Sequence, residues 1–246
     1  MWWGSHRSAG GTLFEPPPLD PLSCQNYLVI LAAWNESEMV GTVVKDLRDM
    51  NLNVLVVDDG STDNTSEIAK EAGALVIRHE TNLGKGQALA DGYRYAFKEG
   101  YDAIVTMDAD GQHDPQDVPR FFDAYDRTGI PVLIGNRIRD REHMPRVRRI
   151  TNRMMSHMLN RKMTQYVPDI QHGFRLYQTD VVMMVIPETQ GFAAESEILL
   201  TLDEIDIRMG SIPISAHYHG EKSHIRPIHD TRLFFKMLKR RGRASG

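Results

Sequence analysis

Cysteine is almost absent from this chain of 246 residues, since Cys24 is the only one. A single thiol excludes an internal disulfide framework and fits a reducing compartment. Long apolar runs are also missing, because no stretch approaches the roughly 18 residues that cross a bilayer. The net charge of −4 argues against general nucleic-acid binding. We therefore expect a cytoplasmic protein whose membrane contact, where it has one, is peripheral and on the cytoplasmic face.

Three segments of the chain differ in composition. Residues 1–25 are rich in Gly, Ser and Pro, which is typical of a flexible leader. Residues 26–232 have the regular pattern of one domain, and residues 233–246 form a basic amphipathic tail. Strands are expected at 27–33, 53–58, 74–78, 103–108 and 131–135, with helices at 37–50, 65–72, 85–99 and 116–128. This alternation predicts an α/β fold with a Rossmann-like, mostly parallel sheet flanked by helices.

Polar side chains follow three of the expected strands. They are Asn35 and Glu36 after the first strand, Asp58 and Asp59 after the second, and Asp108 and Asp110 after the fourth. Ligands of open α/β sheets bind beyond the carboxyl ends of the strands. A turn needs only one aspartate, so adjacent carboxylates at several strand ends predict a binding site.

The stretch MDADGQHDP, residues 107–115, places Asp108 and Asp110 one residue apart. Two such carboxylates repel each other unless a cation lies between them. The spacing does not fit a calcium loop, because His113 stands where that loop needs glycine. An incomplete set of oxygen ligands suits Mg²⁺ or Mn²⁺ with substrate phosphates completing the shell. His113 itself is typical of a structural turn residue.

The stretch NLGKGQALADG contains Lys85 between two glycines at the expected start of a helix. Such a loop can bind phosphate at the helix N-terminus, although a glycine-rich entry into a helix explains it equally well. Seven arginines then fall within residues 137–153: Arg137, Arg139, Arg141, Arg146, Arg148, Arg149 and Arg153. They lie beside an apolar stripe of Val147, Ile150, Met154 and Met158. In an acidic chain this combination favours a phosphate-bearing or anionic-membrane partner over a merely solvated face.

For two further stretches, the residues alone do not indicate a role. The stretch DIQHGFRLY, residues 169–177, contains Arg175 and is expected to be too polar for the core. The stretch GFAAESEILL opens an apolar helix with Glu195 and Glu197 near its start. Acidic residues at a helix N-terminus are ordinary dipole complementarity.

Eight motifs together resemble, in their order and spacing, those of family 2 glycosyltransferases of GT-A fold. They are AAWNE, VVDDGSTDNT, NLGKGQAL, MDADGQHDP, GNR, DIQHGFR, FAAESEI and EKSHIRP. The chain is especially similar to dolichyl-phosphate mannose synthases and related polyprenyl-phosphate sugar transferases. The resemblance implies metal ligands at Asp108, Asp110 and Gln112. It implies catalytic residues at Asp110, Arg137 and Arg175, and acceptor-phosphate contacts at Arg148 and Asn152. It implies nucleotide-sugar contacts at Ala32, Trp34, Glu36, Asp59, Lys85, Asp108, Ala109 and Lys222.

The implied reaction is inverting sugar transfer from a GDP-mannose or UDP-glucose type donor to a polyprenyl phosphate, dependent on Mg²⁺ or Mn²⁺. Ala32 and Trp34 replace the proline and tyrosine that are usual in the family, so the identity of the donor's nucleotide base, guanine or uracil, stays open. A saccharide or protein hydroxyl acceptor is the alternative, with Asp169, Glu195 or Glu197 as the catalytic carboxylate. A second alternative is a nucleotide-binding module without activity, which an intact Asp108–Asp110 pair disfavours. The sequence indicates no oligomeric state.

Overall fold

The computed structural model describes residues 26–137, 146–170, 172–187, 193–215 and 234–235, and for residues 146–152 it describes the backbone alone. The expected leader over residues 1–25 and most of the expected tail lie outside the described residues.

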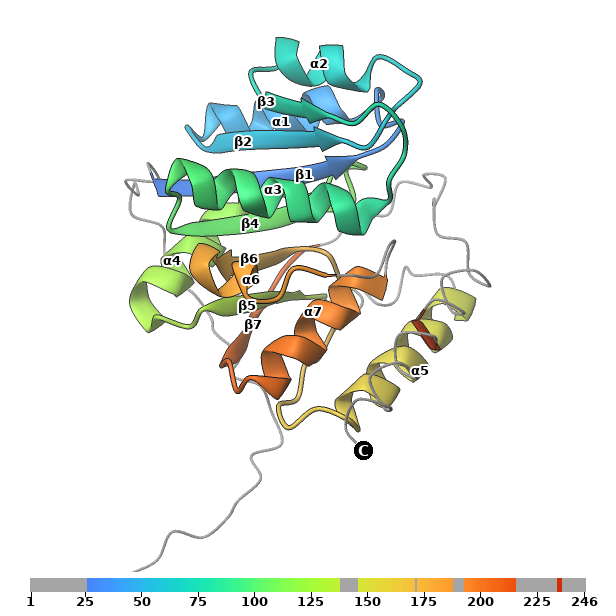
Figure 1. The fold of residues 1–246 in the computed structure, drawn as a ribbon, viewed down its shortest axis with the longest axis vertical. Coiled ribbons are helices and arrows are strands. Elements are labelled where there is room, and N and C mark those ends of the chain that lie inside the picture. Colours follow the sequence, from blue (N-terminus) through green and yellow to red (C-terminus); the bar gives the residue numbers. More distant parts are fainter. Residues whose placement is uncertain (1–25, 138–145, 171, 188–192, 216–233, 236–246) are drawn as a thin grey trace, which may run out of the picture.

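A seven-stranded sheet forms the centre of one α/β domain (Figure 1). Its strands are β1 (Tyr27–Ala33), β2 (Asn53–Asp58), β3 (Leu75–Arg78), β4 (Ala103–Asp108), β5 (Val132–Asn136), β6 (Arg175–Gln178) and β7 (Met209–Pro213). The strand order is β3-β2-β1-β4-β6-β5-β7. Strand β6 is antiparallel to β4 and β5, whereas the other pairs are parallel. The expected α/β class and mostly parallel sheet are confirmed.

Helices cover both faces of the sheet. They are α1 (Val40–Asp49), α2 (Thr65–Glu71), α3 (Lys85–Glu99), α4 (Val118–Thr128), α5 (Arg146–Asn160), α6 (Thr179–Met183) and α7 (Ala193–Glu204), with a short 3-10 helix η2 (Pro115–Asp117) before α4. Helices α3 and α4 end at Gly100 and Gly129, whose φ angles of 78° and 60° suit glycine because it has no Cβ.

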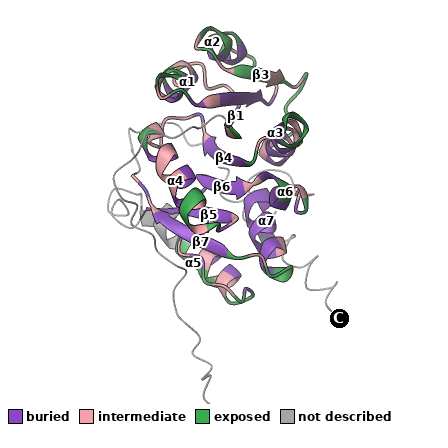
Figure 2. Cartoon of the chain, turned by 90° about the vertical axis from the view of Figure 1, so that its left-hand side faces the viewer, coloured by how far each residue is buried: buried purple, intermediate pink, exposed green. Residues whose placement is uncertain are grey.

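The core consists of two apolar layers, one on each side of the sheet. Alternate residues of β1 point to opposite faces, so Leu28 and Ile30 pack with α3 and α7, whereas Val29 and Leu31 pack with α1 and α4. Figure 2 shows the buried strands between these helices. Burial of each large apolar side chain contributes about 1.5–3 kcal/mol to folding. The sheet is therefore a rigid frame for the loops at its ends.

The expectation that residues 169–177 are too polar for the core is wrong. Ile170, Phe174 and Arg175 are fully buried, and β6 inserts between β4 and β5. This placement is possible because the guanidinium of Arg175 donates to main-chain carbonyl oxygens of residues around it. The polarity of the sequence led to the wrong expectation because the polar groups of this segment form hydrogen bonds inside the protein.

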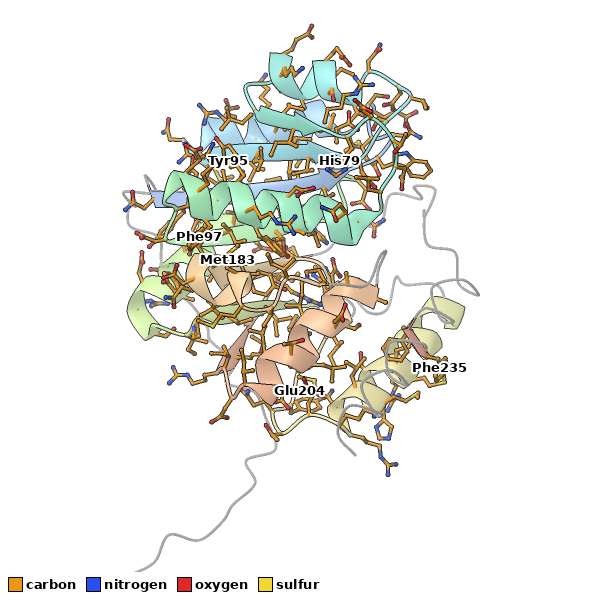
Figure 3. All side chains as sticks on the ribbon, viewed as in Figure 1. His79, Tyr95, Phe97, Met183, Glu204 and Phe235 are labelled. Carbon is orange, nitrogen blue, oxygen red and sulfur yellow. The ribbon has the colours of Figure 1, made fainter. Side chains whose placement is uncertain are left out.

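Helix α5 presents a different apolar face from the expected stripe, as far as its side chains are described. Met155 and Leu159 are buried in the core, whereas Met154 is 46% exposed. Met158 is partly buried against the core, while Val147 and Ile150 fall among the side chains that the structure does not describe. Figure 3 shows Phe235 beside α5, where it is 43% exposed. No helix in the described parts of the chain is long and apolar enough to cross a membrane.

Candidate active site

The carboxyl ends of three neighbouring strands bring the polar residues of the sequence motifs together. Strand β1 lies between β2 and β4, and its residues Ala32 and Ala33 pair with Asp108 of β4 and Asp58 of β2. The chain runs from β1 to β2 and β3 on one side and then crosses over to β4 on the other. This is the switch point at which ligands of open α/β sheets bind.

Asp58 and Asp59 have different partners. Asp58 is fully buried, accepts a 2.8 Å hydrogen bond from the Ser61 amide and another from the Ser66 hydroxyl, and so fixes the turn after β2. That turn in turn fixes Asn35, whose main-chain amide donates to Ser61 Oγ at 2.9 Å. Asn35 has a φ of 57°, a conformation that asparagine tolerates better than most residues. Asp58 is therefore a structural residue of the site's wall.

Asp59 holds the loop that leads into α3. Its Oδ1 and Oδ2 accept hydrogen bonds from the amides of Leu83 and Gly84 at 2.8 Å and 2.7 Å. His79 Nδ1 lies 2.8 Å from the same Oδ1, and its Nε2 lies 3.2 Å from Asp91 Oδ2. Figure 3 marks His79 near the end of β3. These bonds position the loop before Lys85, and the expected contact of Asp59 with the nucleotide stays a prediction.

Lys85 joins two carboxylates that are far apart in the sequence. Its Nζ lies 2.5 Å from Asp108 Oδ1 and 2.7 Å from Glu195 Oε1. Burial alone would lower the pKa of Lys85, but the two carboxylates outweigh burial and hold that pKa above its ordinary value. Gly173 makes room for the cluster, because a Cβ there would lie 2.8 Å from Glu195 Oε1. Its place in the QHGF motif is the only feature of the sequence that points to Gly173.

The segment after β4 turns sharply at Gly111, which has a φ of 76°. Asp110 Oδ1 accepts the amide of Gln112 at 3.0 Å, and Ala109 between the two aspartates is buried. His113 Nδ1 accepts the amide of Asp108 at 3.1 Å, so its proton is on Nε2. Burial lowers the pKa of His113 to about 4, and this ring is a neutral support of the site.

The expected catalytic arginines both lie inside the protein. Arg137 forms a two-pronged ion pair with Asp169, with Nε to Oδ2 at 2.8 Å and Nη2 to Oδ1 at 3.1 Å. Arg175 is fully buried and donates to the carbonyl oxygens of His172, Glu195 and Ile170 at 2.6–2.8 Å. These contacts hold the start of α7 against β6. In this structure Arg175 is thus a positioning residue, and a direct role in transfer stays a prediction for both arginines.

The remaining expected contacts are placed only in part. Ala32, Trp34 and Glu36 are half-buried at the end of β1, and the Glu36 amide donates to Thr65 Oγ1 at 2.9 Å. Lys222 lies outside the described residues, and the side chains of Arg148 and Asn152 lie outside them as well, although the backbone of both is in α5.

The donor set at the end of β4 fits a hard divalent cation. Asp108 and Asp110 offer oxygen ligands, and Asp108 already faces one cation, the ammonium of Lys85. Among the described residues no group of three or more His, Cys, Asp or Glu side chains would hold a metal ion by itself. Mg²⁺ is commonly bound through one or two carboxylates with substrate phosphates and water completing its shell. An incomplete protein site is what such binding requires.

Comparison with known proteins identifies the family. The family model described as glycosyl transferase family 2 matches residues 28–185. The chain belongs to glycosyltransferase family 2. This glycosyltransferase is 30% identical over 213 residues to the UDP-N-acetylglucosamine–dolichyl-phosphate N-acetylglucosaminyltransferase of Methanococcus voltae, covering 77% of this chain and 85% of the relative. It is 28% identical over 200 residues to the undecaprenyl-phosphate mannosyltransferase of Micrococcus luteus, covering 76% and 82%.

A solved structure shares the fold of this glycosyltransferase. Glucosyl-3-phosphoglycerate synthase from Mycobacterium tuberculosis, in complex with Mn²⁺, UDP-glucose and phosphoglyceric acid, superposes with a TM-score of 0.74. The match has 20% sequence identity and covers 93% of this chain and 86% of the other. The expected GT-A fold is confirmed, and the chain is a glycosyltransferase.

Proposed function

We propose that this glycosyltransferase moves a sugar from a nucleoside diphosphate sugar to a polyprenyl phosphate, with inversion at the anomeric carbon and with Mg²⁺ or Mn²⁺ on the donor. The relatives in Methanococcus voltae and Micrococcus luteus are named for transfer to dolichyl phosphate and undecaprenyl phosphate. The structural neighbour binds Mn²⁺ together with UDP-glucose. The observation that carries the proposal in this chain is the meeting of Asp108, Asp110 and Lys85 at the switch point of the sheet.

In the proposed reaction, an acceptor phosphate oxygen forms a bond with the anomeric carbon. The bond from that carbon to the donor diphosphate breaks, and the departing nucleoside diphosphate takes its electron pair. A bound divalent cation, held by Asp108, Asp110 and Gln112, would neutralise charge on the diphosphate. The chain's own cations contribute positioning and charge stabilisation, which can supply most of the rate enhancement of a transfer reaction.

An acceptor phosphate needs no side-chain base, because its second pKa is about 6 and it is ionised near neutral pH. The structure favours this acceptor over a hydroxyl. Two of the three candidate bases, Asp169 and Glu195, are engaged by Arg137 and Lys85 in short ion pairs. The oxygens that a general base would use are therefore already in contact with cations of the protein.

We also propose a peripheral contact of this enzyme with an anionic membrane surface, which would bring it to a lipid-linked acceptor. Arg153 and Met154 of α5 are both exposed and adjacent, and Phe235 is exposed beside this helix. A basic and apolar surface of this kind suits the boundary of an anionic lipid layer.

The acceptor is tested with a panel of GDP- and UDP-sugars, each offered with a short polyprenyl phosphate, a free saccharide or a peptide with serine residues. We expect transfer to the polyprenyl phosphate alone, with one donor preferred. Transfer to the saccharide or peptide in preference to the lipid phosphate would contradict the proposed acceptor and favour a hydroxyl-directed transferase.

A further inference from the structure

An ammonium group lies between two carboxylates at the place proposed for the metal. Lys85 is the first residue of α3, and its Nζ contacts Asp108 at 2.5 Å and Glu195 of α7 at 2.7 Å. The Lys85 side chain is 15% exposed and that of Glu195 is 8% exposed, so water screens this arrangement weakly. Asp108 therefore has a resident protein cation on one of the oxygens that a metal ion would use.

Glu195, which anchors this ammonium, is itself held in place by Arg175. The main-chain carbonyl of Glu195 accepts a 2.8 Å hydrogen bond from Arg175 Nη1, and the Glu195 carboxylate lies 4.0 Å from Arg175 Nη2. Gly173 leaves room for the ammonium on the other side, because a Cβ there would approach Lys85 Nζ to 3.1 Å. The two carboxylates lie at contact distance on the ammonium and stabilise its charged form.

We propose that Lys85, anchored by Glu195, is a built-in counter-cation that opposes metal binding to Asp108 until the donor diphosphate arrives. The inference rests on the proposed metal-dependent transfer and adds a rule for the order of binding. Without nucleotide, a divalent ion at Asp108 meets a nearby positive charge, which weakens its binding. The negative diphosphate offsets that repulsion, so metal and donor bind together. Glu195 acts through Lys85 and is a positioning residue.

The experiment measures Mn²⁺ binding to the full chain by the electron paramagnetic resonance signal of free Mn²⁺, first without nucleotide and then with UDP or GDP. We expect Lys85→Gln to tighten nucleotide-free Mn²⁺ binding by about tenfold, because a unit charge within a few ångströms is removed. Lys85→Arg keeps the charge and should bind Mn²⁺ like the wild type. Lys98→Gln makes the same charge change at an 81% exposed position of the same helix, and it should leave the affinity unchanged.

Glu195→Gln provides an independent variant with the opposite expectation. It removes a negative charge and releases Lys85 toward Asp108, so nucleotide-free Mn²⁺ binding should weaken by several-fold. In the wild type, nucleotide should tighten Mn²⁺ binding strongly, and in Lys85→Gln this gain should be smaller. Far-UV circular dichroism checks that each variant folds, and if Lys85→Gln does not, Glu195→Gln decides the matter.

Two failures are distinguishable. The proposed counter-cation role of Lys85 would be overturned if Lys85→Gln bound Mn²⁺ without nucleotide no more tightly than the wild type does. That result would leave the proposed function intact. Affinity in Glu195→Gln that equals or exceeds the wild-type value would overturn the counter-cation role as well. Absence of Mn²⁺ binding in every form, with UDP or GDP present, would instead contradict the metal role in the proposed function and remove this inference with it.

Discussion

At the scale of single residues, the site depends on a close fit around one glycine. Gly173 is the point where the loop before β6 passes the cluster of Lys85, Asp108 and Glu195. An added Cβ would come within 2.8 Å of Glu195 Oε1 and 3.4 Å of Asp108 Oδ2. Real Cβ atoms do not approach oxygen to 2.8 Å, so the Glu195 carboxylate or the loop must shift, whereas the distance to Asp108 is an ordinary contact.

Gly173→Ala should therefore reduce transfer by about tenfold or more, because a displacement near 1 Å in a catalytic site can cost up to a hundredfold. Gly100→Ala is the matched control. Gly100 also has special backbone geometry, with a φ of 78°, but a Cβ there meets no atom of the described residues within 4 Å. The control should lose about 1 kcal/mol of stability and keep its activity. Equal activity of Gly173→Ala and wild type would show that the cluster tolerates displacement.

The residues also show what a sequence can reveal. Asp108 and Asp110 were identified because adjacent like charges at a strand end need a reason, and Lys85 was identified by its glycine-rich loop. The pairing of Lys85 with Glu195 could not be read from the sequence, because 110 positions separate them and an acidic residue such as Glu195 is ordinary at a helix start without any partner. Buried ion pairs of this kind are set by tertiary contacts, which periodicity does not encode.

At the scale of elements, one carboxylate makes three of the contacts that hold the loop between β3 and α3. Asp59 accepts the amides of Leu83 and Gly84 and also faces His79. Asp59→Ala removes all three contacts at once. It should lower the free energy of unfolding by about 1–3 kcal/mol, since each hydrogen bond to a charged group contributes about 1.5–3 kcal/mol and water can replace part of this at an exposed loop.

The same change should weaken binding of the donor, because the loop positions Lys85. Calorimetry with UDP and GDP and urea unfolding measure the two effects. Asp91→Ala is the control, since Asp91 faces His79 from the other side and touches neither loop amide. We expect Asp91→Ala to cost less stability than Asp59→Ala. Equal losses in the two variants would assign the effect to His79 rather than to the loop amides.

Helices and strands were predicted correctly where the apolar residues follow one clear periodicity. The prediction failed where an element is short and polar. The first strand is found at Tyr27–Ala33 and the third helix at Lys85–Glu99, with the predicted bounds. Strand β6 was missed because it has only four residues and two of them, Arg175 and Gln178, are polar. Its antiparallel insertion between β4 and β5 depends on contacts across the sheet.

At the scale of the whole molecule, two buried histidines couple stability to pH. Burial, together with Arg137 and His113, holds the pKa of His172 well below its ordinary value of 6.5. Because the folded-state pKa is depressed, the unfolded chain binds the proton first as pH falls. The stability is therefore fully present above about pH 6.5 and decreases below that value.

For one such histidine, each pH unit below the unfolded-state pKa over which the folded ring stays neutral costs about 1.4 kcal/mol. His172→Asn removes the titrating group while keeping an acceptor for the Phe174 amide, which now donates to His172 Nδ1 at 3.3 Å. We expect the loss of unfolding free energy between pH 7.5 and pH 5 to be smaller in this variant than in the wild type. Urea unfolding at both pH values measures it, and an unchanged difference would show that His172 can be protonated in the folded protein.

The central claim is that the edge of the sheet at Asp108 and Asp110 performs metal-dependent sugar transfer to a lipid phosphate. The direct measurement is transfer of a labelled sugar from the preferred nucleotide donor to polyprenyl phosphate, extracted into organic solvent, with EDTA and after addition of Mg²⁺ or Mn²⁺. The account predicts activity only with added metal, and at least about a hundredfold less in Asp110→Asn, as expected for loss of one electrostatic stabiliser. Asp180→Asn, at an exposed position of α6, should match the wild type. Full transfer in EDTA, or wild-type rates in Asp110→Asn, would contradict the account.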